Sequence, residues 1–305
     1  MRVTGGLMTT RDWETRLRAS AGRFSPGRRR WTRFLQSLPL DPERLALPLQ
    51  SPGDRDFIIC GCPRTGTSLL AAALFQPPAS VTVMEPWDGM RLAPADLFAS
   101  LRKEIESTRQ LARGRLDVDA LYQGGKVRWR PEGGPVPLPA VDADFALGVK
   151  WPGYWRYLGL LPRTKFLVCL RHPLEVISSF KVAGGRVAQG LQYDTAFNAR
   201  LNSELKLATR DMAERRVLLF DYVHERLLPR LNDPNVFVVR YERWFDEPGH
   251  LLGELSEFLG CPLDDTRVVV KRSETTDVLD RDERRMIAAT CRTAEPLGYK
   301  LDQAS

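Results

Sequence analysis

The middle and C-terminal parts of the chain alternate short apolar runs with longer segments of helical periodicity. Four runs have the length and composition of β-strands, at residues 57–60, 145–151, 165–170 and 235–242. The run at 165–170, KFLVCL, is apolar at nearly every position, which is typical of a strand buried on both faces of a parallel sheet.

Segments with helical spacing follow these runs, at residues 68–75, 174–181, 196–231, 248–259 and 280–298. Gly260 directly after the fourth segment is a typical helix stop. Strands that alternate with helices predict an α/β fold, with a central parallel sheet flanked by helices on both faces.

The formal net charge of +7 is concentrated near the N-terminus. Residues 1–33 contain nine arginines and two acidic residues, whereas the rest of the chain has equal numbers of basic and acidic side chains. We therefore expect a basic extension at 1–53, which either contacts an acidic surface or stays solvated, and an α/β domain at 54–305. A balanced body does not favour nucleic acid as a partner.

The five cysteines and three histidines are scattered along the chain, and none of them has the spacing of a zinc site. We expect reduced, packed thiols and no bound metal. No apolar run approaches the roughly 20 residues that span a bilayer. The sequence thus predicts a cytoplasmic protein without a transmembrane segment.

Between the first strand and the first helix the chain reads GCPRTGTS, which fits the P-loop template at every specified position but one. The expected lysine is Thr67, and the cationic side chain is Arg64 instead. Backbone N–H groups of such a loop face an anion at the start of the following helix. The pattern predicts an anion site formed by Gly61, Cys62, Pro63, Arg64, Thr65, Gly66, Thr67 and Ser68.

A second, separate anion site is predicted where the run 165–170 ends. A nucleotide-hydrolysing P-loop protein has a metal-binding aspartate at such a strand end, whereas this chain has Arg171. VLLFD also ends in an aspartate, Asp221, but it lies within continuous helical spacing, so we do not expect it at a strand end. Arg171 either binds an anion or pairs with Glu175 one helical turn later.

Together these motifs resemble the sulfotransferases that use 3′-phosphoadenosine 5′-phosphosulfate (PAPS), which have a P-loop-like three-layer α/β fold. PRTGTS is similar to the family's 5′-phosphosulfate loop, and RHPLEVISS is similar to its 3′-phosphate motif, with Arg171 and, eight residues later, Ser179. The segment VVRYERWFDEP and the closing LGY extend the resemblance over residues 56–301.

The resemblance implies transfer of a sulfuryl group from PAPS to a hydroxyl or amine, with adenosine 3′,5′-bisphosphate (PAP) as the product. It also implies that no metal ion takes part, because Arg64 and the loop would stabilise the charge on the leaving phosphate.

The resemblance also bears on the general base. Many relatives have a histidine in a KTHxP-like string, but the matching place here reads KWP, beginning at Lys150. Other branches have a glutamate some twenty residues after the loop, and Glu85 occupies that place, with Asp88 as the second choice. Lys150 is then an extra cation near the transferred group. The RKG-like donor loop of the family's cytosolic animal members is absent, and the candidates in its region are Lys271, Arg272 and Ser273.

The acceptor has no recognisable sequence code. We expect the irregular segment at 113–144 and the stretch after Lys150 to shape its pocket, and small-molecule, glycan and lipid acceptors all stay open. Two other functions also stay open: a divergent P-loop kinase that uses ATP and Mg²⁺, and a non-catalytic module that keeps the nucleotide site without a base.

Overall fold

The protein is described by a computed structural model that covers residues 49–86, 89, 92–111, 136–138, 140–192, 196–268, 270 and 278–301. All of them belong to the unit Leu40–Ser305. The main sheet has five strands, β1 (Asp56–Gly61), β2 (Ser80–Met84), β5 (Ala146–Lys150), β6 (Lys165–Leu170) and β7 (Val236–Arg240). A small two-stranded sheet pairs β3 (Gln110–Leu111) with β4 (Val136–Pro137).

The described helices are α3 (Thr67–Ala73), α4 (Pro94–Thr108), α6 (Pro173–Ala183), α7 (Gly185–Ala188), α8 (Ala196–Ala208), α9 (Met212–Leu227), α10 (Arg243–Asp246), α11 (Pro248–Leu259) and α12 (Arg281–Thr290). Short 3₁₀ helices are η2 (Pro152–Tyr157), η3 (Leu228–Arg230) and η4 (Asp265–Arg267).

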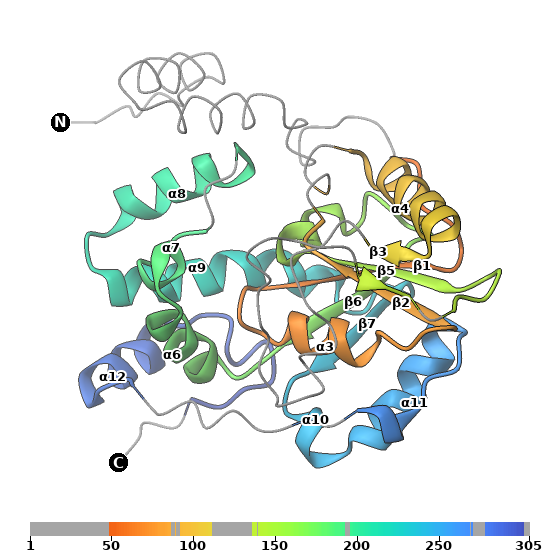
Figure 1. Cartoon of the computed structure of the whole chain (residues 1–305). Helices are drawn as coiled ribbons and strands as arrows, with labels where there is room; N and C mark the ends of the chain where they lie inside the picture. Colours follow the sequence, from red (N-terminus) through yellow and green to blue (C-terminus); the bar gives the residue numbers. More distant parts are fainter. Residues whose placement is uncertain are drawn as a thin grey trace. The chain divides into compact units, whose positions relative to one another are not determined.

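The five strands of the main sheet lie in the order β2-β5-β1-β6-β7, and every neighbouring pair is parallel. β1 is the central strand: β5 and β2 lie on one flank of it, and β6 and β7 lie on the other flank. Helices α3 and α11 lie on one side of the sheet and α4 on the other (Figure 1). The predicted three-layer α/β fold is confirmed, and all five carboxyl ends meet at one edge, where ligands bind in open α/β sheets.

Close packing between β1 and its neighbours explains two features of the sequence. Gly148 in β5 leaves room for the ring of Phe57, since a Cβ at this position would overlap that ring. The alanines of α3, Ala71 to Ala73, are buried against the sheet, because small side chains let this helix approach the strands closely.

Most predicted elements agree with the structure to within a few residues, but four differences stand out. Strand β2 and helix α4 were not predicted. The segment 196–231 is not one helix: α8 ends at Ala208, and α9 starts after Asp211, whose side chain accepts a hydrogen bond from the Ala213 N–H at 2.6 Å. The last helix stops at Thr290 rather than near residue 298. Asp221 lies inside α9, as predicted.

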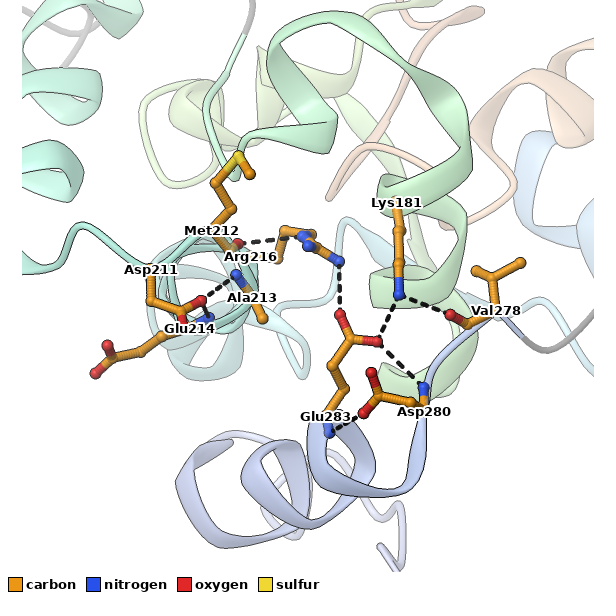
Figure 2. Close-up of polar contacts among 9 residues, drawn as sticks. All are labelled: Lys181, Asp211, Met212, Ala213, Glu214, Arg216, Val278, Asp280 and Glu283. Carbon is orange, nitrogen blue, oxygen red and sulfur yellow. Dashed lines mark hydrogen bonds and ion pairs between the residues drawn. The ribbon is translucent and has the colours of Figure 1, made fainter.

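Helices α6, α9 and α12 are joined by a partly buried ionic cluster (Figure 2). The Glu283 carboxylate accepts a hydrogen bond from Lys181 Nζ at 2.7 Å and lies 3.6 Å from Arg216 Nη1. Lys181 Nζ also donates to the carbonyl of Val278 at 2.8 Å. Asp280 caps α12 by accepting from the Glu283 N–H at 2.8 Å. One carboxylate therefore connects the start of α12 to both neighbouring helices.

None of the helices in the described part of the chain is long and apolar enough to cross a membrane.

Candidate active site

The candidate residues lie at the carboxyl ends of the five main strands. The loop 61–68 follows β1, Glu85 follows β2, Lys150 ends β5, and Arg171 follows β6. Tyr241 follows β7 in the same way. Because all five strands are parallel, residues far apart in the sequence are brought to one edge.

The loop after β1 closes tightly on itself. Gly61 has a φ of 146°, and a Cβ at this position would lie 2.6 Å from the Cys169 carbonyl oxygen of the neighbouring strand. The Thr65 hydroxyl donates to the Cys62 carbonyl at 2.7 Å and closes the turn. Burial raises the pKa of the Cys62 thiol well above its usual range. Cys62 is therefore a neutral packing group and not a nucleophile.

The end of the loop packs against Tyr241. Gly66 precedes α3 with a φ of 98°, and a Cβ there would lie 2.6 Å from Cδ2 of the Tyr241 ring. Only glycine combines this backbone conformation with so close an approach. Thr67 and Ser68 then form the first turn of α3, with Thr67 buried and Ser68 partly exposed.

Arg64 has its backbone in the left-handed region, with a φ of 71°, which is uncommon for a residue other than glycine. Its exposed side chain turns to α6, where Nε donates to Ser179 Oγ at 2.9 Å. The bond joins two motifs that are 115 residues apart. Strained backbone of this kind persists where surrounding contacts hold it, and it is concentrated at functional sites.

Arg171 is buried and is held from three sides. Its Nε donates to Glu175 Oε2 at 2.7 Å, so the predicted pairing along the helix is present. Its Cζ lies 4.0 Å from the centre of the Tyr241 ring, and Nη1 is 3.4 Å from the Arg64 carbonyl oxygen. Arg64 therefore contacts both Arg171 and Ser179, so the loop and the second predicted motif lie side by side, and these three residues form a cationic cluster.

Glu85 and Lys150 form an ion pair at the carboxyl ends of the neighbouring strands β2 and β5. Lys150 Nζ lies 2.6 Å from Glu85 Oε1, and the two side chains are 3% and 15% exposed, respectively. The Glu85 N–H donates to the Lys150 carbonyl at 2.8 Å. Glu85 has a φ of 48°, so both Arg64 and Glu85 have a backbone that costs energy to maintain.

Two residues that the sequence argument did not select complete this edge. Tyr241 touches both the loop and Arg171, as described above. Glu242 accepts a hydrogen bond from the His172 N–H at 2.8 Å, and Tyr299 Oη lies 3.3 Å from its other oxygen. Burial, followed by the Glu242 charge, raises the pKa of Tyr299. Glu242 thus ties the closing LGY segment to the start of α6. The signal that could have revealed both residues is their place at the end of the fourth predicted strand.

Four of the candidates, Asp88, Lys271, Arg272 and Ser273, lie outside the described residues. Within the described ranges no group of three or more His, Cys, Asp and Glu side chains is arranged to hold a metal ion. The hydrogen-bond donors at this edge of the sheet are guanidinium, ammonium and hydroxyl groups, which suit an anionic ligand.

Several solved structures are similar to the chain. Sulfotransferase STF9 from Mycobacterium avium has 15% identity, with 94% of this chain and 97% of that chain covered and a TM-score of 0.44. A sulfotransferase from Alicyclobacillus acidocaldarius has 15% identity, with coverages of 82% and 95% and a TM-score of 0.42. Mouse sulfotransferase SULT7A1, solved with PAP, has 14% identity, coverages of 82% and 70% and a TM-score of 0.35.

No match was found among curated proteins. A protein-family model described as "Sulfotransferase family" matches residues 56–265, a range that runs from β1 to η4 and includes the loop, Glu85, Lys150, Arg171 and Ser179. Since this match spans well over half of the chain, the protein belongs to the sulfotransferase family.

Proposed function

We propose that this protein transfers a sulfuryl group from PAPS to a hydroxyl or amine of an acceptor and releases PAP. The observation that carries the proposal is the hydrogen bond between Arg64 and Ser179, which unites the two motifs expected at the two anionic ends of the donor. Family membership supports the reaction class.

The cationic cluster would bind the donor. Arg64 is exposed, so its guanidinium can face a phosphosulfate while Ser179 orients it. Arg171 is fixed by Glu175 and Tyr241, and a fixed cation loses little entropy when an anion binds. The loop residues 61–68 contribute backbone N–H groups, and Lys271, Arg272 and Ser273 remain candidate contacts.

The Glu85 and Lys150 pair would serve the acceptor. As the acceptor oxygen or nitrogen forms its bond to sulfur, its proton passes to the Glu85 carboxylate, and the electron pair of the breaking S–O bond goes to the leaving phosphate. Arg64 stabilises that developing charge electrostatically, a role that needs no covalent step. Lys150 holds Glu85 in place and supplies a second positive charge nearby.

The direct test compares thermal stabilisation by PAP with stabilisation by ATP and Mg²⁺. A ligand at about 100 times its Kd stabilises the native state by roughly 2.7 kcal/mol, which is readily measured. We expect PAP to stabilise the protein and Arg64→Ala to lose most of the effect. Arg55→Ala is the matched control, because Arg55 precedes β1 at the opposite edge of the sheet.

Stabilisation by ATP and Mg²⁺ alone would favour the kinase and would overturn the proposal. Turnover is tested by PAP release from PAPS with a panel of phenol, alcohol and amine acceptors. PAP binding without turnover on a broad panel, unaffected by Glu85→Gln, would favour the non-catalytic module.

A further inference from the structure

The segment that begins with Glu85 is attached at both ends to the segment that begins with Lys150. At its start, Glu85 is bound through its N–H and its side chain to Lys150, at 2.8 and 2.6 Å. At its end, the carbonyl of Gly89 accepts a buried hydrogen bond from the Tyr154 hydroxyl. Both attachments therefore come from residues 150–154, which run from the end of β5 into η2.

Tyr154 is held firmly enough to act as an anchor. Its side chain is buried, its ring stacks on Trp151 at 6.0 Å between centroids, and the ring of Tyr157 packs against it edge-on. Burial raises the pKa of Tyr154 well above its usual range, so the hydroxyl keeps its proton and acts as a donor. The backbone N–H of Trp151 in turn donates to the Ile59 carbonyl of β1 at 3.0 Å.

The contact at Gly89 leaves no spare room. A Cβ there would lie 2.9 Å from Tyr154 Oη and 3.0 Å from both the Pro86 carbonyl oxygen and Trp151 Cε3. The Gly89 N–H donates to that same Pro86 carbonyl at 2.9 Å. Gly89 is therefore bound on both of its backbone polar groups, by the Pro86 carbonyl and by the Tyr154 hydroxyl.

We propose that Tyr154 is a positioning residue that keeps the Glu85 carboxylate beside Lys150, at a fixed distance from the phosphate loop. The inference rests on the proposed function, in which Glu85 is the general base. Because the φ of Glu85 lies in the left-handed region, the local backbone alone does not favour this conformation. Anchors at both ends hold it, and through Trp151 the Tyr154 anchor is tied to β1, the strand that carries the loop.

The experiment combines a structural and a catalytic readout on the full chain. Tyr154→Phe deletes the hydroxyl and keeps the ring, whereas Gly89→Ala keeps the hydroxyl and pushes the clamped carbonyl away. Tyr157→Phe is the matched control, because it removes a buried tyrosine hydroxyl from the same 3₁₀ helix. Hydrogen exchange measured by mass spectrometry follows a peptide that spans residues 81–93, and PAP release from PAPS gives kcat and the KM for PAPS.

We expect exchange in the 81–93 peptide to become about tenfold faster at residue 89 in both test variants, since one buried hydrogen bond is lost. We also expect kcat to fall about tenfold, while the KM for PAPS and the Kd for PAP stay within twofold, because the cationic cluster is untouched. The Tyr157→Phe variant should match the wild type in exchange and in kcat.

Unchanged exchange and kcat in Tyr154→Phe and Gly89→Ala would overturn the inference. The inference would also be overturned if kcat and PAP affinity fell equally in the two test variants and if Tyr157→Phe showed the same losses. Tyr154 would then contribute only to packing. Failure of the proposed function gives a different result: Glu85→Gln would then turn over PAPS at the wild-type rate, while exchange would still report whether Tyr154 holds the segment.

Discussion

Replacing Ser179 by alanine tests the cationic cluster most directly. The substitution removes the oxygen that accepts the 2.9 Å hydrogen bond from Arg64 Nε, and it leaves the guanidinium in place. Without this bond the guanidinium is mobile, and PAP has to order it on binding, at a cost of about 0.5–1.5 kcal/mol for a long side chain. Because Ser179 is also a candidate contact of the ligand itself, we expect the upper end of this range, and 1.4 kcal/mol corresponds to a tenfold change in Kd. PAP should bind about tenfold more weakly.

The adjacent serine provides a matched control. Ser178 is also buried in α6, but its hydroxyl has no hydrogen-bond partner among the described residues. Ser178→Ala should therefore leave PAP affinity unchanged. Affinities come from thermal shift titrations with PAP, and urea unfolding without ligand shows that both variants fold. The reasoning is refuted if Ser179→Ala binds PAP within twofold of the wild type, or if Ser178→Ala weakens binding equally.

Two further predictions concern stability. Burial lowers the pKa of His224 to about 4, an effect that the Phe220 carbonyl and the Asp221 charge offset only in part. The histidine pKa in the unfolded chain is about 6.5, so the unfolded state binds a proton before the folded state does. The free energy of unfolding therefore keeps its full value above pH ~6.5 and decreases as the pH falls toward ~4. Between pH 7 and pH 5, urea unfolding should show a loss about 2 kcal/mol smaller for His224→Gln than for the wild type; equal losses would contradict this. Glu283→Gln leaves the buried Arg216 and the nearby Lys181 without their shared anion and should lower the free energy of unfolding by roughly 1–3 kcal/mol. Asp282→Asn, at an exposed site of the same helix, should cost less than about 0.5 kcal/mol, and a similar loss in both variants would show that the cluster contributes little.

The sequence predicted those strands in which nearly all side chains are apolar. The run KFLVCL matched β6 residue for residue because every side chain after Lys165 is buried. Strand β2 was missed since two of its five positions, Ser80 and Thr82, are polar yet fully buried. The Thr82 hydroxyl donates a hydrogen bond to the Ala71 carbonyl of α3 at 2.6 Å. A partner on another element cannot be recognised from the residues around Thr82 in the sequence.

The candidate site was predictable as a set of residues but not as an arrangement. Arg64, Arg171 and Glu85 were found from spacing and resemblance, and all three lie at the expected edge. Their contacts depend on strand order, which puts β2 next to β5 and so brings Glu85 to Lys150. Tyr241 was missed because its role depends on the close approach of Gly66, a tertiary contact without a sequence signature.

The strand order has a consequence for how such enzymes diversify. Under the proposed function, the elements that bind the donor follow β1, β6 and β7, while the proposed base and its anchors follow β2 and β5, which lie together on the other side of β1. The carboxyl ends of the strands therefore form two groups, a proposed donor-binding group after β1, β6 and β7 and a proposed acceptor-facing group after β2 and β5. Exchanging the loops after β2 and β5 together between relatives should transfer acceptor preference while donor affinity is retained, whereas exchanging either loop alone would separate Glu85 from its anchors.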